Sequence, residues 1–107
     1  MGRIVVTGIG VISAIGNNVS ENHSSLQKGV TGIGKAQFLN SKYADELLFG
    51  EVKLSNSELH SLAGSFDLPG LTRTELLAFM AFREAVANAQ LSNEELKSFQ
   101  TALLSGT

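Results

Sequence analysis

The chain has 107 residues, of which 43% are apolar and 17% are charged, and it contains no cysteine. This composition is ordinary for a single globular domain and excludes a disordered tail. With a formal charge of −2 and scattered Lys and Arg residues, the sequence has no basic patch for a polyanion, so we expect no nucleic-acid partner. Without cysteine, the chain can form no disulfide or thiolate zinc site and offers no cysteine nucleophile.

The N-terminal residues predict a strand rather than a targeting or membrane segment. Residues 3–7 (RIVVT) form a β-branched run without alternation of polar and apolar positions, which is typical of a strand buried on both faces of a parallel sheet. Glycines at positions 8, 10 and 16 interrupt the apolar stretch, and no run reaches the ~18 residues that a membrane helix needs. We therefore expect a cytoplasmic location and no membrane partner.

A short helix and a long connection are expected after this strand. Asn18 and Glu21 have the spacing of a capping box, and Gly29 is a favourable residue just past a helix end. This pattern predicts a helix over residues 20–28. Residues 30–41 contain glycines and show no apolar period, which predicts a long surface connection.

The rest of the chain predicts two further helices and two further strands. Residues 72–75 form a complete capping box, and the apolar stripe over residues 75–89 predicts a long helix that buries one broad face. Residues 92–95 repeat the box and predict a short helix. Apolar runs at 47–54 and 101–104 predict strands. Three apolar strands with few helices would leave sheet edges uncovered, so we expect further polypeptide or a partner to cover them.

The sequence offers no set of residues that can be assembled into a nucleophile and its base. His23 and His60 lie far apart and in no ligand spacing, so we interpret them as solvated helix residues and expect no metal. The Gly8-Ile9-Gly10 stretch lacks the third glycine of a dinucleotide fingerprint, and residues 29–36 lack the hydroxyl of a phosphate loop. We interpret both stretches as turns and expect no cofactor. Two alternatives stay open, a small nucleotide-binding module and a non-enzymatic interaction domain that completes its sheet by association.

Residues 5–17 (VVTGIGVISAIGN) resemble the opening strand and loop of the β-ketoacyl-acyl-carrier-protein synthases, which are elongating condensing enzymes of the thiolase-like superfamily. Residues 29–33, 50–52 and 78–91 resemble the later turn, second-strand motif and alanine-rich helix of that family, in the same order. The resemblance implies an α/β fold, the N-terminal part of a thiolase-like α-β-α-β-α arrangement with an incomplete mixed or parallel sheet and packed helices. Residues 1–107 would then be a segment of the N-terminal domain and not a whole domain.

Some positions depart from the family pattern and indicate a divergent member. Ala14 stands where the family usually has proline, and residues 88–90 (Asn-Ala-Gln) replace its aspartate-alanine-glycine signature. Leu39-Asn40 follows Phe38 where an aspartate is expected.

The resemblance also implies a function for the parent protein. The family reaction is the decarboxylative condensation of acyl and malonyl thioesters in fatty acid, polyketide or polyene synthesis, with acyl-carrier protein as partner and a homo- or heterodimer as assembly. The catalytic cysteine and two histidines of the family have no counterpart here, so we assign no catalytic residue and leave open whether the chain is enzymatic. Thr107 alone is expected near the acyl pocket, as its gate. The alternatives are a chain-length-factor-like subunit and a stand-alone interaction domain.

Overall fold

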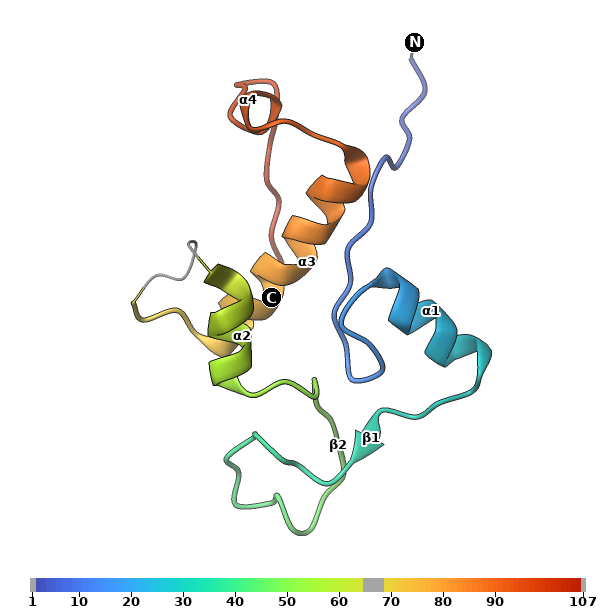
Figure 1. Cartoon of the computed structure of the whole chain (residues 1–107), viewed down its shortest axis with the longest axis vertical. Helices are drawn as coiled ribbons and strands as arrows, with labels where there is room; N and C mark the ends of the chain where they lie inside the picture. The colour runs from blue at the N-terminus through green and yellow to red at the C-terminus, as the bar shows by residue number, and fades with distance from the viewer. Residues whose placement is uncertain (1, 65–68, 107) are drawn as a thin grey trace.

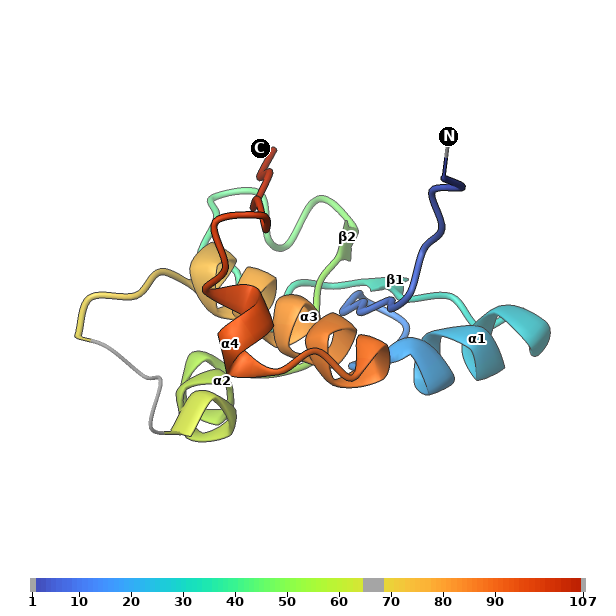
Figure 2. The ribbon, with the colours of Figure 1, turned by 90° about the horizontal axis from the view of Figure 1, so that it is seen from above.

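The computed structural model describes residues 2–64 and 69–106, and helix α3 runs through its middle (Figure 1). In chain order the elements are α1 (Val19–Gln27), β1 (Ile33–Gly34), β2 (Phe49–Gly50), α2 (Asn56–Ala63), α3 (Arg73–Ala89) and α4 (Asn93–Leu96). Helix α2 packs on one side of α3, and extended segments from both ends of the chain cross the opposite side (Figure 2). The radius of gyration, 16.2 Å, exceeds the ~13 Å typical of a compact domain of this length. The arrangement is therefore open.

The three helices predicted from the sequence begin where their caps predict. Asn18, Thr72 and Ser92 each accept a hydrogen bond from the backbone N–H three residues on, at the start of α1, α3 and α4. Gly29 follows α1 with a φ of 64°, in the left-handed region that favours glycine. No helix in the described ranges is long and apolar enough to cross a membrane.

Helix α2 is an addition to the elements expected from the sequence. It begins with the same capping box as α3 and α4, because the Ser55 side chain accepts from the Glu58 backbone and the Glu58 carboxylate accepts from the Ser55 N–H at 2.7 Å. The Ser-x-x-Glu spacing that predicts a helix start was thus present in the sequence, directly after the predicted strand. That strand, placed over residues 47–54, is too long by four residues at its C-terminal end.

The mixed or parallel sheet expected from the sequence is wrong for the described part of the chain. The ladder found there is antiparallel and joins β1 to β2, in the register Ile33 to Gly50 and Gly34 to Phe49. The segments at residues 3–7 and 101–104 are extended, but neither forms a ladder. A strand needs a neighbouring backbone that supplies its hydrogen bonds, and no described segment supplies one to either.

The apolar core is small and lies between α2 and α3. Leu59, Ala63 and Leu76 are at most 2% exposed. Partly buried apolar side chains surround these three, namely Ile12, Leu54, Leu71, Leu77, Phe79 and Met80. The broad buried face expected for α3 is realised in part, since Leu76 is the buried residue of this helix and Phe82 is 42% exposed.

Residues 8–11 cross the other side of α3 at close range. Gly8 and Gly10 face a row of small side chains spaced four residues apart, Ala81, Ala85 and Ala89. A Cβ on Gly8 would lie 2.7 Å from the Cβ of Ala89, which is closer than packed carbon atoms approach. The two glycines therefore permit helix contact and do not form the turn expected there. The turn lies further on, where Ser13 and Gly16 form an isolated bridge.

Replacing Gly10 by alanine is expected to destabilise the chain. The added Cβ would overlap the carbonyl oxygen of Ala81 and lie 2.7 Å from the Ala85 nitrogen, so the segment must move away from α3. We expect a loss of about 1–3 kcal/mol in the free energy of unfolding, measured by urea denaturation. Gly34→Ala is the matched control, because nothing lies within 4 Å of its Cβ position. Equal losses in the two variants would contradict the packing role of Gly10.

Candidate functional site

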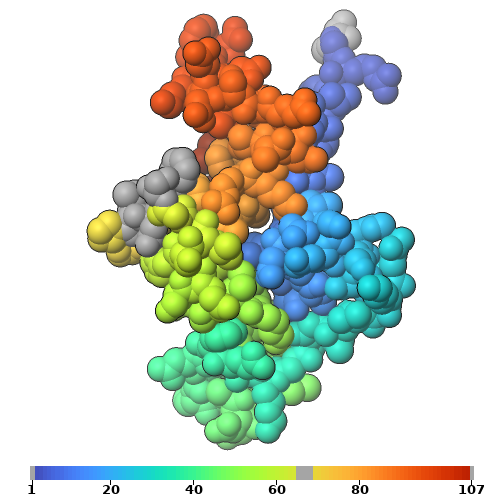
Figure 3. Space-filling model, viewed as in Figure 1, coloured from blue at the N-terminus to red at the C-terminus, as the bar shows by residue number. Residues whose placement is uncertain are grey.

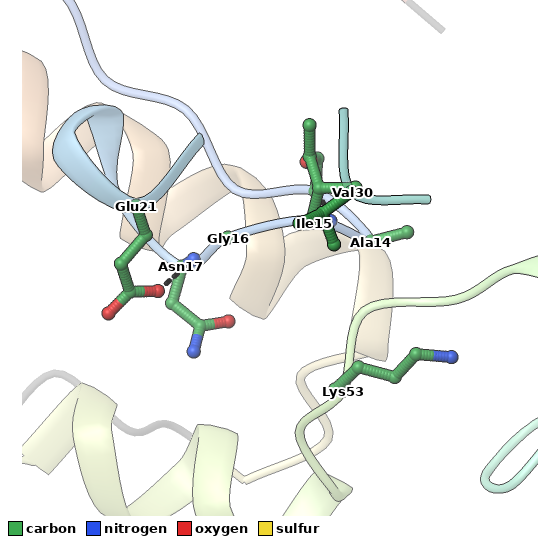
Figure 4. Close-up of a pocket in the computed structure, with 8 residues that line it drawn as sticks. Ala14, Ile15, Gly16, Asn17, Glu21, Val30 and Lys53 are labelled. Atoms are coloured by element: carbon green, nitrogen blue, oxygen red, sulfur yellow. Dashed lines mark hydrogen bonds between the residues drawn. The ribbon is translucent and has the colours of Figure 1, made fainter. Parts of the chain in front are cut away.

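The turn after the N-terminal segment forms one wall of a shallow hollow of about 240 Å³ (Figure 4). Ala14, Ile15 and Gly16 contribute this wall. Val30, from the segment after α1, and Lys53, from the segment before α2, contribute the others. Three separate parts of the chain therefore meet around the hollow.

Asn22 of α1 fixes the shape of this turn. Its side chain is only 8% exposed, and its Nδ2 donates to the carbonyl oxygens of Gly16 at 2.9 Å and Asn18 at 2.8 Å. Its Oδ1 accepts a short hydrogen bond from the Ser13 hydroxyl. Because an amide oxygen is not a base, Ser13 is held as a structural donor and is not activated as a nucleophile.

Two opposite charges border the hollow. The Glu21 carboxylate accepts a hydrogen bond from the Asn17 N–H at 2.7 Å, drawn as a dashed line in Figure 4. Lys53 lies across the hollow from it, and its ammonium group makes no hydrogen bond or ion pair to the rest of the described chain. The hollow lacks a nucleophile paired with a base among the residues that the structure describes.

A second polar cluster surrounds Glu51, which directly follows β2 and is 9% exposed. Its carboxylate accepts backbone hydrogen bonds from Gln37 at 2.7 Å and Phe38 at 3.0 Å, and a third from Leu39. Burial raises the pKa of the Glu51 carboxyl, but these backbone bonds and the Arg73 charge together outweigh burial and lower the pKa below its ordinary value. The ionised Glu51 side chain therefore holds the loop between β1 and β2 in place.

Arg73 connects this cluster to α3. Its guanidinium donates to the carbonyl oxygens of Leu54 at 2.8 Å and Val52 at 2.9 Å, and it lies 5.7 Å from the centre of the Phe38 ring. The planar guanidinium fork can serve several acceptors at once. The first residue of α3 thus ties the segment before α2, and the loop held by Glu51, to the long helix.

A third polar cluster joins the N-terminal segment to α3. The Glu84 carboxylate accepts from the Val11 N–H at 3.0 Å and from the Val19 N–H at 2.8 Å. One helical turn on, the Asn88 side chain accepts from the Ile9 N–H at 3.1 Å. The sequence analysis assigned this role to neither Glu84 nor Asn88. The glycines at positions 8 and 10 are the sequence feature that could have indicated a close contact with a helix. The Glu84 and Asn88 side chains add hydrogen bonds to that contact.

The structure places the other candidate site residues as follows. Thr107 lies outside the described residues. His23 is exposed on α1 and His60 is half-buried on α2, so the expected helical placement of both is confirmed, while full solvation is wrong for His60. Residues 29–36 run from a helix into a strand, the reverse of the order in a phosphate loop. No group of three His, Asp or Glu side chains gathers to hold a metal within residues 2–64 and 69–106.

Comparison with known proteins identifies the family. Residues 1–107 match the model of the β-ketoacyl synthase N-terminal domain. The chain is 32% identical over its full length to 3-oxoacyl-[acyl-carrier-protein] synthase 1 of Buchnera aphidicola from Acyrthosiphon pisum, covering 26% of that protein. It is 34% identical to synthase 1 of Escherichia coli K12, over 88% of this chain and 22% of that protein. It is 37% identical to 3-oxoacyl-[acyl-carrier-protein] synthase 2 of Staphylococcus aureus COL, over 87% of this chain and 22% of that protein.

The chain therefore belongs to the β-ketoacyl synthase family, as the resemblance of residues 5–17 predicts. It spans about a quarter of the length of these curated relatives. No solved structure matches the chain significantly.

The pH dependence of stability is expected to change in a Glu51→Gln variant. Because the Glu51 pKa is lowered in the folded chain, its stabilising contribution is complete above the ordinary carboxyl pKa and is lost as the pH falls through the folded-state value. Urea denaturation from neutral to acid pH should show a steeper loss for the wild type than for the variant. At neutral pH the variant should be less stable by about 1.5–3 kcal/mol, since it loses hydrogen bonds to a charged group.

Glu46→Gln is the matched control for this series, because Glu46 is exposed on the same loop and its carboxylate accepts no hydrogen bond within the described ranges. Its curve should follow that of the wild type. Parallel curves for the wild type and Glu51→Gln would show that the Glu51 carboxylate has no part in the acid transition.

Glu84→Ala should loosen the contact between α3 and the N-terminal segment. The substitution leaves the Val11 and Val19 N–H groups without their acceptor, at a cost of about 1–3 kcal/mol for each group that stays buried. Amide hydrogen exchange at these two residues should accelerate in the variant. Glu94→Ala, on α4, is the control. Unchanged exchange at Val11 in Glu84→Ala would refute the role assigned to Glu84.

Proposed function

We propose that this chain is the N-terminal scaffold portion of a β-ketoacyl-acyl-carrier-protein synthase. The parent reaction would be the decarboxylative condensation of acyl and malonyl thioesters in fatty acid synthesis. The observation that carries the proposal is the match of all 107 residues to the N-terminal domain of the family. Identities of 32–37% to proteins named 3-oxoacyl-[acyl-carrier-protein] synthase support it.

In this proposal the chain positions other parts of the enzyme and does not perform the chemistry. The sequence has no cysteine, so the thiolate that takes the acyl group is supplied elsewhere in the parent protein. The described polar groups act on the chain's own backbone: Asn22 fixes the turn at residues 13–16, Glu51 fixes the loop before β2, and Glu84 fixes the N-terminal segment. Rigid support of this kind keeps catalytic groups in place.

The same proposal extends to the partner, location and assembly of the parent protein and to the place of Thr107. Acyl-carrier protein would be the partner of the parent protein, which the names of the relatives support. The parent would be a cytoplasmic homo- or heterodimer, with residues 1–107 as one segment of its N-terminal domain. Thr107 would lie at the gate of the acyl pocket. A role in polyketide or polyene synthesis is an extension of the same condensing chemistry.

A chimera tests the proposed function. Residues 1–107 would replace the matching segment of the E. coli synthase 1, and the purified chimera would be given acyl- and malonyl-carrier protein. We expect β-ketoacyl product by mass spectrometry, because the proposal gives this segment the same scaffold role in both proteins. The E. coli protein lacking this segment should be inactive. A folded chimera that forms no product would contradict the proposed function and favour a chain-length-factor-like role.

A further inference from the structure

The β1–β2 loop, residues 35–48, forms one end of the molecule. Figure 3 shows it as the teal and green mass at the bottom, below α1 and α2. The structure describes every residue of this loop and buries none of them. The apolar core between α2 and α3 also contains no residue of the loop among those described. Burial of apolar surface therefore contributes little to the position of the loop, and such a segment can open while the core stays folded.

Hydrogen bonds within the β1–β2 loop maintain its shape. The Ala44 N–H donates to the Ser41 carbonyl oxygen at 3.1 Å, and the Leu47 N–H donates to the Tyr43 carbonyl oxygen at 2.9 Å. The antiparallel ladder of β1 with β2 joins the two ends of the loop. Because these interactions are local, the loop can keep its shape and move about the ladder as one unit.

A single side chain holds the β1–β2 loop to the rest of the molecule. Beyond the ladder, the hydrogen bonds from the loop to the rest of the described chain all end on the Glu51 carboxylate. The N–H groups of Gln37 and Phe38 donate to it at 2.7 Å and 3.0 Å, and the Leu39 N–H donates as well. Arg73 adds a weaker contact, since its guanidinium lies 5.7 Å from the centre of the Phe38 ring.

A hollow of about 360 Å³ lies between this part of the loop and α3. Phe38, Leu39 and Asn40 form its wall on the loop side. The opposite wall includes Val52, which is only 9% exposed, and Leu77 of α3. The apolar side chains of the body thus face the loop residues that Glu51 holds, so that movement of the loop exposes them to solvent.

We propose that the β1–β2 loop is a hinged lid over this hollow, held closed by the Glu51 carboxylate. The lid opens when the hydrogen bonds to Glu51 break, while the β1–β2 ladder and the core between α2 and α3 stay intact. Opening is a local transition, separate from the unfolding of the chain. The lid controls when the apolar lining of the hollow meets solvent, and it does so whatever reaction the parent protein performs.

Native-state amide exchange of the full 107-residue chain at low urea concentrations tests the lid. Exchange at Phe38 and Leu39, corrected for intrinsic rates, should be nearly independent of urea, because local opening exposes little surface. Exchange at Met80, in the middle of α3, should accelerate steeply with urea, because it requires global unfolding.

The Glu51→Gln variant tests the role of the carboxylate. Exchange at Phe38 and Leu39 should rise by about tenfold or more, because an amide accepts these hydrogen bonds less strongly than a carboxylate does. Glu46→Gln is the matched control, since the Glu46 carboxylate lies on the same loop and accepts no hydrogen bond within the described ranges. Its rates should equal those of the wild type.

A thiol probe reports on the hollow itself. Because the sequence has no cysteine, Val52→Cys introduces a single thiol beneath the lid. Its labelling by iodoacetamide should also be nearly independent of urea, and adding Glu51→Gln should accelerate it by about tenfold or more.

The outcomes decide the proposal even if Glu51→Gln does not fold, because the urea dependence is measured without that substitution. Exchange at Phe38 and labelling at position 52 that follow the urea dependence of Met80 would overturn the lid, since the loop would then open only with the whole chain. Labelling at the rate of an unfolded chain in the absence of urea would also overturn it, because the hollow would not be covered. Equal rates at Phe38 in folded Glu51→Gln and the wild type would remove Glu51 as the group that holds the lid closed.

Discussion

The structure depends on the contact between α3 and the extended residues 8–11. Glycines at positions 8 and 10 let the backbone approach the alanine row of the helix, and Glu84 and Asn88 then accept the N–H groups that face it. Side chains of a helix here accept the backbone hydrogen bonds of an extended segment, which in a sheet would go to a neighbouring strand. Glu84 also accepts from the N–H of Val19, the first residue of α1, so the same side chain ties the start of that helix to α3.

The sequence predicts the helices better than the strands, for a physical reason. A helix satisfies its own backbone and is marked by local caps, so the boxes at Thr72 and Ser92 predict α3 and α4 correctly. A strand takes its hydrogen bonds from another segment, and β-branched composition at residues 3–7 carries no information about where that segment is. The antiparallel pairing of β1 with β2 has no signal in the short stretches that form it.

The polar clusters around Glu51 and Glu84 could not be predicted from the sequence. Glu51 and Glu84 look like surface carboxylates, because their acceptor roles depend on backbone groups that lie 12 to 14 and 65 to 73 residues away. The family, in contrast, is evident from residues 5–17, whose glycines and small apolar residues are the ones that contact α3 and shape the following turn. The residues that identify the family therefore serve the packing of this chain.

The most direct test of this account is residue-resolved amide hydrogen exchange of the wild-type chain, followed by NMR. We expect protection at Ile9, Val11 and Val19, whose N–H groups are held by Asn88 and Glu84. We expect Val5 and Val6 to exchange at the rate of an unfolded chain, because their backbone has no partner in the described structure. Exchange at Val11 as fast as at Val6 would contradict the central role of α3.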